Sequence, residues 1–251
     1  TLTTDFGLSD WFVGTMKGVI ASIDPDARVI DITHGIHQGH IREGSFALAA
    51  AAHFFPEGTV HVGVIDPGVG TSRHGLVVEC HQQFFVVPDN GLLSAAVPFG
   101  VPFRAYRIEN KSLFLPTVSR TFHGRDIFAP VAAHLTRGLD PAEVGPATDE
   151  MVRLSLPGPV ESFAGLCGEV VYVDQFGNAI SSFPIELADK PGMIQLPDGN
   201  RASLVSSYAD VAEGDLLAVA GSTGFIEVAI RNGSAAVVHQ LKVGDPLILE
   251  T

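Results

Sequence analysis

The sequence predicts an α/β protein, with an N-terminal, mostly parallel α/β sandwich domain and a smaller C-terminal all-β, barrel-like domain. Residues 1–65 alternate short apolar runs with segments of helical periodicity, which is the β-α-β-α-β order of a mostly parallel sheet. Beyond residue 165 only short β-type runs remain, and turn residues separate them. The stretch 151–164 contains Leu-Pro-Gly-Pro and marks this change, so we expect domains at 1–155 and 165–251.

Each expected element follows from its local pattern. The helix at 43–55 is rich in alanine and stops at Pro56, and Pro130 should bend the helix that contains it. In chain order we expect strand 2–4, helix 11–23, strand 28–33, helix 43–55, strand 59–65, paired strands 76–79 and 83–87, a short helix at 91–96, strand 103–108 and helix 125–136. In the C-terminal part no helix is expected, and strands are expected at 168–173, 179–183, 193–196, 216–220, 225–230 and 246–249.

The composition narrows the classes of protein. The 251 residues carry a formal net charge of −13, which argues against nucleic acid as a partner and favours neutral or cationic ligands. Charged residues make up 17% of the chain and hydrophobic residues 46%, whereas roughly 25% charged is usual for soluble domains. We therefore expect some apolar surface to be buried between the subunits of an oligomer.

Cysteine usage and the longest apolar runs indicate the compartment. Cys80 and Cys167 each lie in an apolar run, which is typical of buried free thiols in a reducing environment. No apolar run is long enough to span a bilayer, and no basic segment precedes an apolar one at the start of the sequence. No membrane association is expected, and the predicted location is the cytoplasm.

The strongest candidate for chemistry is the stretch from Val64 to Arg73, taken together with the motif Thr121-Phe-His-Gly-Arg-Asp126. An apolar run ends at Asp66, so a buried strand places this carboxylate at its carboxyl end, where open α/β sheets bind ligands. Arg73 follows a loop of small residues, and His123 precedes a glycine. A carboxylate, a guanidinium and an imidazole from such loops can together handle a water molecule.

Two other interpretations of that stretch stay open. Pro67-Gly68 and Gly70 can simply shape a turn, with Asp66 as its hydrogen-bonding first residue. A phosphate cradle is the other, but the stretch lacks the Gly-Lys-Ser/Thr ending of a P-loop and the third glycine of a dinucleotide fingerprint.

Asp5 and Asp10 flank the first loop between a strand and a helix, where one carboxylate can accept both hydroxyls of a ribose. The alternative is that Asp5 is a turn residue and Asp10 a charge at the helix N-terminus.

A second group of candidates lies in the C-terminal part. Asp174-Gln-Phe-Gly-Asn178 offers an amide for a purine edge, an aromatic face for stacking and a carboxylate, although a hairpin turn explains Gly177-Asn178 equally well. Ser222 lies in a loop, and Glu227 on an apolar strand needs a partner that an exocyclic amine would supply.

His34, His37 and His40 form a His-x-x-His-x-x-His run that could suggest a metal site. Their spacing does not put three imidazoles on one helical face, and no cysteine or second histidine pair lies nearby to complete a zinc shell. We therefore expect loop histidines on a polar surface and no metal.

Several motifs occur in order through nearly the whole chain: Thr4-Asp-Phe-Gly7, Val29-Ile-Asp-Ile-Thr-His34, Phe54-Phe-Pro-Glu-Gly-Thr59, Pro88-Asp-Asn-Gly-Leu92, Thr121-Phe-His-Gly-Arg-Asp126, Asp174-Gln-Phe-Gly-Asn178 and Leu241-Lys-Val-Gly-Asp245. Together they resemble the S-adenosylmethionine hydroxide adenosyltransferases, which are relatives of the fluorinase and chlorinase enzymes. The resemblance implies an N-terminal α/β domain, a C-terminal β-domain and a homotrimer whose ligand lies between the N-domain of one subunit and the C-domain of its neighbour.

The resemblance also implies roles for individual residues. Asp66, Arg73 and His123 match the set that handles the attacking water, and the halogenases have tyrosine where this chain has Asp66. Asp5 matches the ribose-binding aspartate, and Asp174 lies where the methionine end is held. The other expected substrate contacts are Asp10, Phe122 and Phe176, and the adenosine-binding positions Asn178, Ser222, Glu227 and Ile230.

The sequence departs from the family pattern in three places. Residues 36–40 lack a proline and an aspartate that are common there, and Phe12 and Thr223 replace a serine and an arginine that hold the amino acid in the fluorinase. The long insertion that fluorinases carry between the strands near Glu79 and Gln83 is absent.

The function that the resemblance implies is hydrolysis of S-adenosylmethionine to adenosine and L-methionine, by in-line attack of an activated water on C5′ of the ribose and without a cofactor. One alternative is a halogenase of the same fold, against which Asp66 argues. Another is a non-catalytic trimer that binds adenosine, which would have no need of Arg73.

Overall fold

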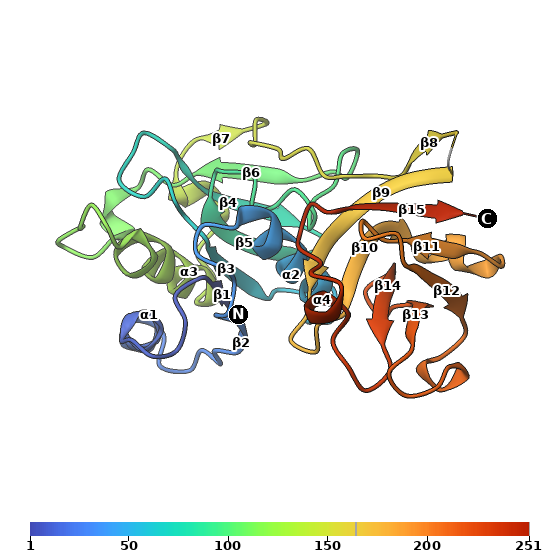
Figure 1. The fold of residues 1–251 in the computed structure, drawn as a ribbon. Helices are drawn as coiled ribbons and strands as arrows, with labels where there is room; N and C mark the ends of the chain where they lie inside the picture. The colour runs from blue at the N-terminus through green and yellow to red at the C-terminus, as the bar shows by residue number, and fades with distance from the viewer. Residues whose placement is uncertain (164, 251) are drawn as a thin grey trace. The chain divides into compact units, whose positions relative to one another are not determined.

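The computed structural model describes residues 1–163 and 165–250. The chain divides into two compact units, Thr1–Ser155 and Leu156–Thr251, which are called unit 1 and unit 2 below. Unit 1 combines helices with one sheet, and unit 2 is built almost entirely of strands (Figure 1). The expected fold class, an α/β part followed by a smaller barrel-like β part, is confirmed.

Unit 1 contains a seven-stranded sheet in the order β2-β1-β3-β5-β4-β6-β7. Strands β2, β1, β3 and β5 are parallel neighbours, and β4, β6 and β7 add antiparallel pairs. The strands are β1 (Leu2–Thr4), β2 (Asp31–Thr33), β3 (Val60–Val64), β4 (Gly75–Cys80), β5 (Gln83–Pro88), β6 (Arg104–Arg107) and β7 (Ala147–Thr148).

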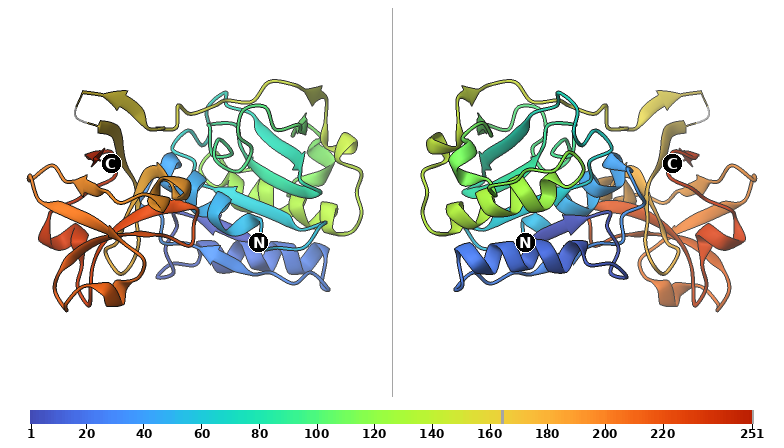
Figure 2. Two further views of the ribbon diagram at one scale, coloured as in Figure 1. Left: turned by 90° about the vertical axis from the view of Figure 1, so that its right-hand side faces the viewer. Right: turned by 90° about the vertical axis from the view of Figure 1, so that its left-hand side faces the viewer.

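Helices cover both faces of this sheet because successive strand side chains point to opposite sides. Helices α1 (Phe12–Ile23) and α3 (Ala129–Thr136) lie side by side and pack on the face that carries Val60, Val62 and Val64 (Figure 2). Helix α2 (Ile41–Ala52) packs with the opposite set, which includes Ile65, Phe85 and Val87. The sheet is therefore buried on both sides, as its near-continuous apolar strands indicate.

The segment expected as one helix over 125–136 is made of two parts. A π-helical turn, η2 (Gly124–Phe128), leads directly into α3. Pro130 has no backbone N–H, so it cannot satisfy the carbonyl of Asp126, four residues before it. The backbone N–H of Leu115 donates to this carbonyl instead, at 3.0 Å. Pro130 thus changes the helix type at the point where the site motif ends.

The short helix expected at 91–96 is wrong. Residues 92–96 form successive turns, with one helix-like hydrogen bond from the N–H of Val97 to the carbonyl of Leu93. Leu92 and Leu93 are both buried against α2 and the sheet. The apolar residues of this segment are therefore explained by burial of a tight connection, and they do not indicate a helix.

Unit 2 is a closed seven-stranded barrel, because β10 pairs with β9 as well as with β14, and β8 extends it. All the expected strands are present, whereas β8 and β12 escaped prediction. The strands are β8 (Val160–Ser162), β9 (Gly165–Val173), β10 (Ala179–Pro184), β11 (Met193–Gln195), β12 (Arg201–Val205), β13 (Leu216–Ala220), β14 (Phe225–Ile230) and β15 (Pro246–Glu250).

The expectation that unit 2 has no helix needs correction in a small way. One α-helical turn, α4 (Ala235–Val238), follows β14, and Ser234 caps it through a hydrogen bond from the N–H of Val237. Two 3₁₀ segments, η4 (Ile185–Asp189) and η5 (Tyr208–Asp210), join strands. Each is about one turn long, too short to show a helical period.

The cysteines and the helices allow two further checks. Cys80 is a buried free thiol as expected, but Cys167 is only half-buried, in the part of β9 that pairs with the exposed strand β8. Among the described residues, no helix has the length and apolar character required to cross a membrane.

Buried His61 on β3 gives a stability prediction. Burial lowers the pKa of His61 to about 4, whereas an unfolded histidine titrates near 6.5. Because the unfolded chain binds this proton first, stability should be full above pH 6.5 and fall as the pH is lowered toward 4. Each pH unit between the two values is worth about 1.4 kcal/mol, so the loss from this group should approach about 3 kcal/mol.

Urea unfolding at pH 7 and pH 5 measures this effect. A His61→Gln variant keeps a polar side chain that cannot titrate, so its stability should depend less on pH than that of the wild type. Equal pH dependence in the two proteins would show that other groups cause the acid loss.

Candidate functional site

Two parallel strands of unit 1 end side by side in carboxylates. β1 pairs with β3, and Asp5 and Asp66 follow the carboxyl ends of these strands. The carboxyl edge of a parallel sheet is where open α/β folds bind ligands. A pocket of about 680 Å³ opens there, and it is lined by Asp5, Phe6, Asp10, Phe12, Gln38, Gly39, Val64, Asp66, Pro67, Val69, Thr121, Phe122, His123 and Gly124.

Asp66 and Arg73 form a nearly buried ion pair at this pocket. Arg73 Nε donates to both carboxylate oxygens of Asp66 at 3.0 Å, and Arg73 Nη2 donates to Oδ2. The side chains of Arg73 and Asp66 are only 12% and 4% exposed, so water screens the pair little. The guanidinium also lies over the ring of Phe128, 5.3 Å from its centroid, which fixes its plane.

The same guanidinium determines the state of His123. Arg73 Nη2 lies 2.9 Å from His123 Nδ1, and a guanidinium can only donate, so Nδ1 must be the unprotonated nitrogen. Burial, and then the charge of Arg73, lowers the pKa of His123 below its usual value. His123 is therefore neutral near pH 7 and carries its proton on Nε2, which makes Nε2–H a donor.

The loop between Asp66 and Arg73 requires a glycine at its centre. Gly70 has φ +76°, and a Cβ there would lie 2.3 Å from the carbonyl oxygen of Arg120. This close approach brings the loop against the segment that leads into the His123 motif. The turn interpretation of the stretch is thus correct in part: Asp66 accepts the N–H of Val69, and its side chain is still free to hold Arg73.

Asp5 is held by the loop that contains the three histidines. The N–H of Gly39 donates to Asp5 Oδ2 at 2.8 Å. Burial raises the pKa of Asp5, although this hydrogen bond opposes the rise. Asp10 is exposed at the rim of the pocket and directly precedes Trp11, the N-cap of α1, so the alternative of a charge at the helix N-terminus stays open.

The expectation of loop histidines on a polar surface is met by His37 and His40, which are exposed, but it is wrong for His34. His34 is buried, its Nδ1 lies 2.8 Å from Thr4 Oγ1, and its carbonyl accepts the N–H of Gly7, so it braces the Asp5 loop. The buried Glu43 accepts the backbone N–H of His37 at 3.1 Å and contacts its ring at 3.0 Å. Among the residues that the structure describes, no group of histidine, cysteine and carboxylate side chains could hold a metal ion.

Unit 2 has its own polar pocket, of about 840 Å³, formed by the turn before β10, the end of β13, the strand β14 and the segment η5. It is lined by Asp174, Phe176, Asn178, Tyr208, Ala220, Gly221, Ser222, Glu227, Ile230, Asn232 and Gly233. Every candidate named in the C-terminal part of the sequence lies in this pocket. The sequence candidates thus fall into two sets, one in each unit.

The turn at Asp174 also explains why Asn178 is fixed. Asp174 Oδ1 accepts the backbone N–H groups of Phe176 and Asn178, each at 2.9 Å, and Oδ2 accepts Asn178 Nδ2 at 3.0 Å. Phe176 is 68% exposed beside them. The turn and the binding interpretations are therefore compatible, because a tight turn presents the aromatic ring while the carboxylate orients the amide.

Tyr208 is a pocket residue that sequence reasoning missed. Its hydroxyl donates to Glu227 Oε2 at 2.9 Å and lies 3.4 Å from Asn178 Nδ2. The carboxylate of Glu227 fills the space above Gly221, where a Cβ would lie 2.2 Å from Oε1. The only local signal was Ser207-Tyr-Ala-Asp210, a capping box that begins η5 and directs Tyr208 toward the barrel.

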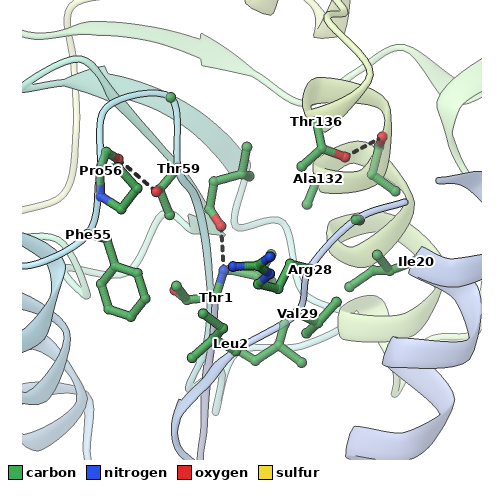
Figure 3. Close-up of a pocket in the computed structure, with 16 residues that line it drawn as sticks. Thr1, Leu2, Ile20, Arg28, Val29, Phe55, Pro56, Thr59, Ala132 and Thr136 are labelled. Carbon is green, nitrogen blue, oxygen red and sulfur yellow. Dashed lines mark hydrogen bonds between the residues drawn. The ribbon is translucent and has the colours of Figure 1, made fainter. Parts of the chain in front are cut away.

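A third pocket, of about 310 Å³, lies at the opposite edge of the unit 1 sheet (Figure 3). It is bounded by the amino ends of β1 and β3 and by the C-terminal turns of α1 and α3. Its walls are mainly apolar, with Arg28 as the charged side chain among them. It holds no set of polar groups that converge on one point, so it is not a second candidate for catalysis.

The fold and the two pockets define a class of two-unit α/β proteins in which Asp66, Arg73 and His123 are in contact at the carboxyl edge of the sheet. Comparison with known proteins agrees. Residues 1–145 match the SAM hydroxide adenosyltransferase N-terminal domain, and residues 168–248 match the C-terminal domain of the same family. The chain belongs to the SAM hydroxide adenosyltransferase family.

Individual relatives cover nearly the full length. An (R)-S-adenosyl-L-methionine hydrolase of Salinispora tropica is 40% identical over 98% of this chain and 95% of its own length. A crystal structure of an uncharacterized conserved protein from Thermotoga maritima superposes with a TM-score of 0.93 at 38% identity, covering 100% of this chain and 99% of that one. A fluorinase of Actinoplanes sp. is more distant, at 27% identity over 96% of this chain and 93% of its own length.

The connection between β4 and β5 marks one difference from the fluorinases. Only His81 and Gln82 join the two strands, both with positive φ (51° and 60°), which is a tight hairpin turn. This is the place where the sequence lacks the long insertion expected of a fluorinase.

Proposed function

We propose that this protein hydrolyses (R)-S-adenosyl-L-methionine to adenosine and L-methionine. The observation that carries the proposal is the nearly buried Asp66–Arg73 pair with neutral His123 beside it, at the pocket on the carboxyl edge of the sheet. The names of the full-length relatives support the same reaction. No metal or cofactor is required in this proposal.

In this reaction the leaving group needs no activation, whereas the attacking water does. When the water oxygen bonds to C5′, the C5′–S bond breaks and its electron pair neutralises the sulfonium, so the thioether leaves without an acid. Water itself is a poor nucleophile, with a pKa near 15.7. The protein must therefore take a proton from water as the new bond forms, and must hold the oxygen in line with the C5′–S bond.

In this proposal three side chains share these tasks. Asp66 is the proton acceptor, because Nδ1 of His123 is occupied by Arg73 and Nε2 already carries a hydrogen. The Nε2–H of His123 donates to the water oxygen and stabilises hydroxide character as it develops. Arg73 keeps both partners in place and balances the negative charge of the site until the proton reaches Asp66.

In this proposal different parts of the substrate bind to the unit 1 pocket and to the unit 2 pocket. Asp5 receives the ribose hydroxyls and Asp10 and Phe122 line the same pocket, whereas Asn178, Ser222, Glu227 and the backbone at Ile230 receive adenosine in unit 2. Asp174 and Phe176 complete the second set, with Asp174 toward the methionine ammonium. Both pockets carry carboxylates, which suits a cationic sulfonium and ammonium.

We further propose a homotrimer in which unit 1 of one subunit and unit 2 of its neighbour form each site. Large apolar side chains are exposed close to both pockets in the single chain, among them Leu8, Trp11, Phe176 and Val237, at 76%, 71%, 68% and 77%. Subunit contacts would bury such side chains. The two free thiols fit a reducing cytoplasm, which we propose as the location.

A halogenase is the second candidate, and two features weigh against it. Asp66 pairs with Arg73 at this pocket, and a carboxylate there repels an anion such as a halide. The two-residue turn between β4 and β5 also leaves out the fluorinase insertion.

Hydrolysis in ¹⁸O-water tests the proposed function. We expect the label in the 5′-hydroxyl of adenosine and none in methionine, because attack at C5′ transfers the water oxygen to the ribose. Preformed adenosine and methionine, incubated with the enzyme in the same water, should take up no label. A 5′-chloro nucleoside formed in added chloride would indicate a halogenase, and release of methylthioadenosine would show attack at the wrong carbon.

A further inference from the structure

Tyr208 connects the two buried polar side chains of the unit 2 pocket. Its hydroxyl donates to Glu227 Oε2 at 2.9 Å and accepts from Asn178 Nδ2 at 3.4 Å. Burial, followed by the hydrogen bond to Glu227, raises the pKa of Tyr208 far above its usual value. The hydroxyl is therefore a permanent donor toward Glu227, and its lone pairs are available to the Asn178 amide.

Both N–H groups of the Asn178 amide are used within the protein. One donates to Asp174 Oδ2 at 3.0 Å, and the other points to Tyr208. The identity of the amide nitrogen follows from chemistry, because an ionised carboxylate cannot donate and so must face NH₂. The carbonyl Oδ1 of Asn178 is the amide group that remains for a ligand.

Glu227 offers the ligand a second hydrogen-bond acceptor, besides the carbonyl of Asn178. It is 8% exposed, and its carboxylate lies between Tyr208 and Gly221. The buried side chains that face the ligand, Asn178 and Glu227, therefore both present acceptors. An amino group can donate to them, whereas a carbonyl oxygen in the same place would face two acceptors and leave the Asn178 carbonyl unpaired, which costs about 1–3 kcal/mol.

We propose that Tyr208 is a specificity-determining positioning residue that holds the Asn178 carbonyl toward the base, so that the pocket selects 6-amino purines over 6-oxo purines. This inference rests on the proposed function, since it places the adenine of the substrate in the unit 2 pocket. In a Tyr208→Phe variant one N–H of Asn178 loses its acceptor. That N–H can then donate to the O6 of a 6-oxo purine, so the selection weakens.

The affinities of adenosine and inosine, measured by calorimetry, test this role without any turnover. The wild type should bind adenosine at least about tenfold more tightly than inosine, because a mismatched base leaves at least one buried acceptor unpaired. In Tyr208→Phe the adenosine-to-inosine ratio should fall by about tenfold, through weaker adenosine and unchanged or tighter inosine binding. The ring of Tyr208 is 40% exposed, so loss of the hydroxyl alone should not unfold the barrel.

Tyr106→Phe is the matched control, because it removes the same hydroxyl from β6 of unit 1 and should leave the ratio unchanged. If Tyr208→Phe binds adenosine with an unchanged ratio, the role of Tyr208 is wrong even when the wild type hydrolyses S-adenosylmethionine. If both nucleosides weaken equally, Tyr208 supports the pocket without selecting the base, and the inference also fails. Adenosine selection without hydrolysis would refute only the proposed function, and binding of neither nucleoside would refute both.

Discussion

Replacing Asp66 with asparagine should reduce turnover by about 10²- to 10⁴-fold, the range that proton transfer by a positioned side chain supplies. Asparagine keeps the size of the side chain and can still accept from Arg73, but it cannot take the proton of the attacking water. The affinity for adenosine should change little, because Asp66 is proposed to act on the transition state and is not among the proposed adenosine contacts. Single-turnover kinetics and adenosine titration measure the two effects.

Asp5→Asn is the informative comparison, since it also removes one carboxylate from the same pocket. This carboxylate is expected to hold the ribose hydroxyls, so the variant should raise KM more than it lowers kcat. The Asp66→Asn variant also removes the negative charge that pairs with Arg73, and loss of one member of a buried ion pair can cost about 3–5 kcal/mol of stability. Adenosine binding therefore serves as the test of folding, and wild-type turnover in a folded Asp66→Asn protein would remove Asp66 from the mechanism.

Mixing two inactive variants should restore activity if each site is shared between subunits. Asp66→Asn damages unit 1, and Asn178→Ala damages unit 2. In a head-to-tail trimer each site combines unit 1 of one subunit with unit 2 of the next. Random assembly of equal amounts then gives about one intact site in four, since each half has a one-in-two chance of being undamaged. About a quarter of wild-type activity should return.

The matched control mixes Asp174→Ala with Asn178→Ala, which both damage unit 2. No combination of these subunits rebuilds an intact pocket, so activity should stay at the level of the parents. Native mass spectrometry must show mixed trimers in both samples. If mixed trimers of Asp66→Asn and Asn178→Ala are no more active than their parents, each site lies within one chain and the shared arrangement is wrong.

Much of the fold could be predicted from the sequence, because strands and helices leave patterns among residues that are close together in the chain. The alternation of apolar runs and helical segments up to β3 predicts a parallel sheet, and the strand that ends at Asp66 predicts a carboxylate at its carboxyl edge. The same local reasoning fails where burial imitates a period. A short helix was expected at 91–96, but Leu92 and Leu93 lie in a turn that packs on α2, and the one-turn α4 is too short to show any period.

For the candidate site, too, the sequence predicted some features and the structure supplied the others. The residue types and the order of Asp66, Arg73 and His123 were visible in the sequence, but the protonation state of His123 was not. It depends on a 2.9 Å contact between side chains that are 50 residues apart in the chain. A sequence pattern carries no such distance, and only the folded loops bring the guanidinium to Nδ1.

Tyr208 shows most clearly what local sequence cannot predict. Nothing in its neighbourhood links it to Asn178, 30 residues before it, or to Glu227, 19 residues after it. The capping box starts η5, and the folded barrel brings Tyr208 of this segment to Asn178, which precedes β10, and to Glu227 on β14. The sequence by itself determined the elements and the chemical groups, because these depend on neighbours along the chain. Only the tertiary structure decided which groups donate and which accept, because hydrogen bonds depend on distances of a few ångströms between elements that are far apart in sequence.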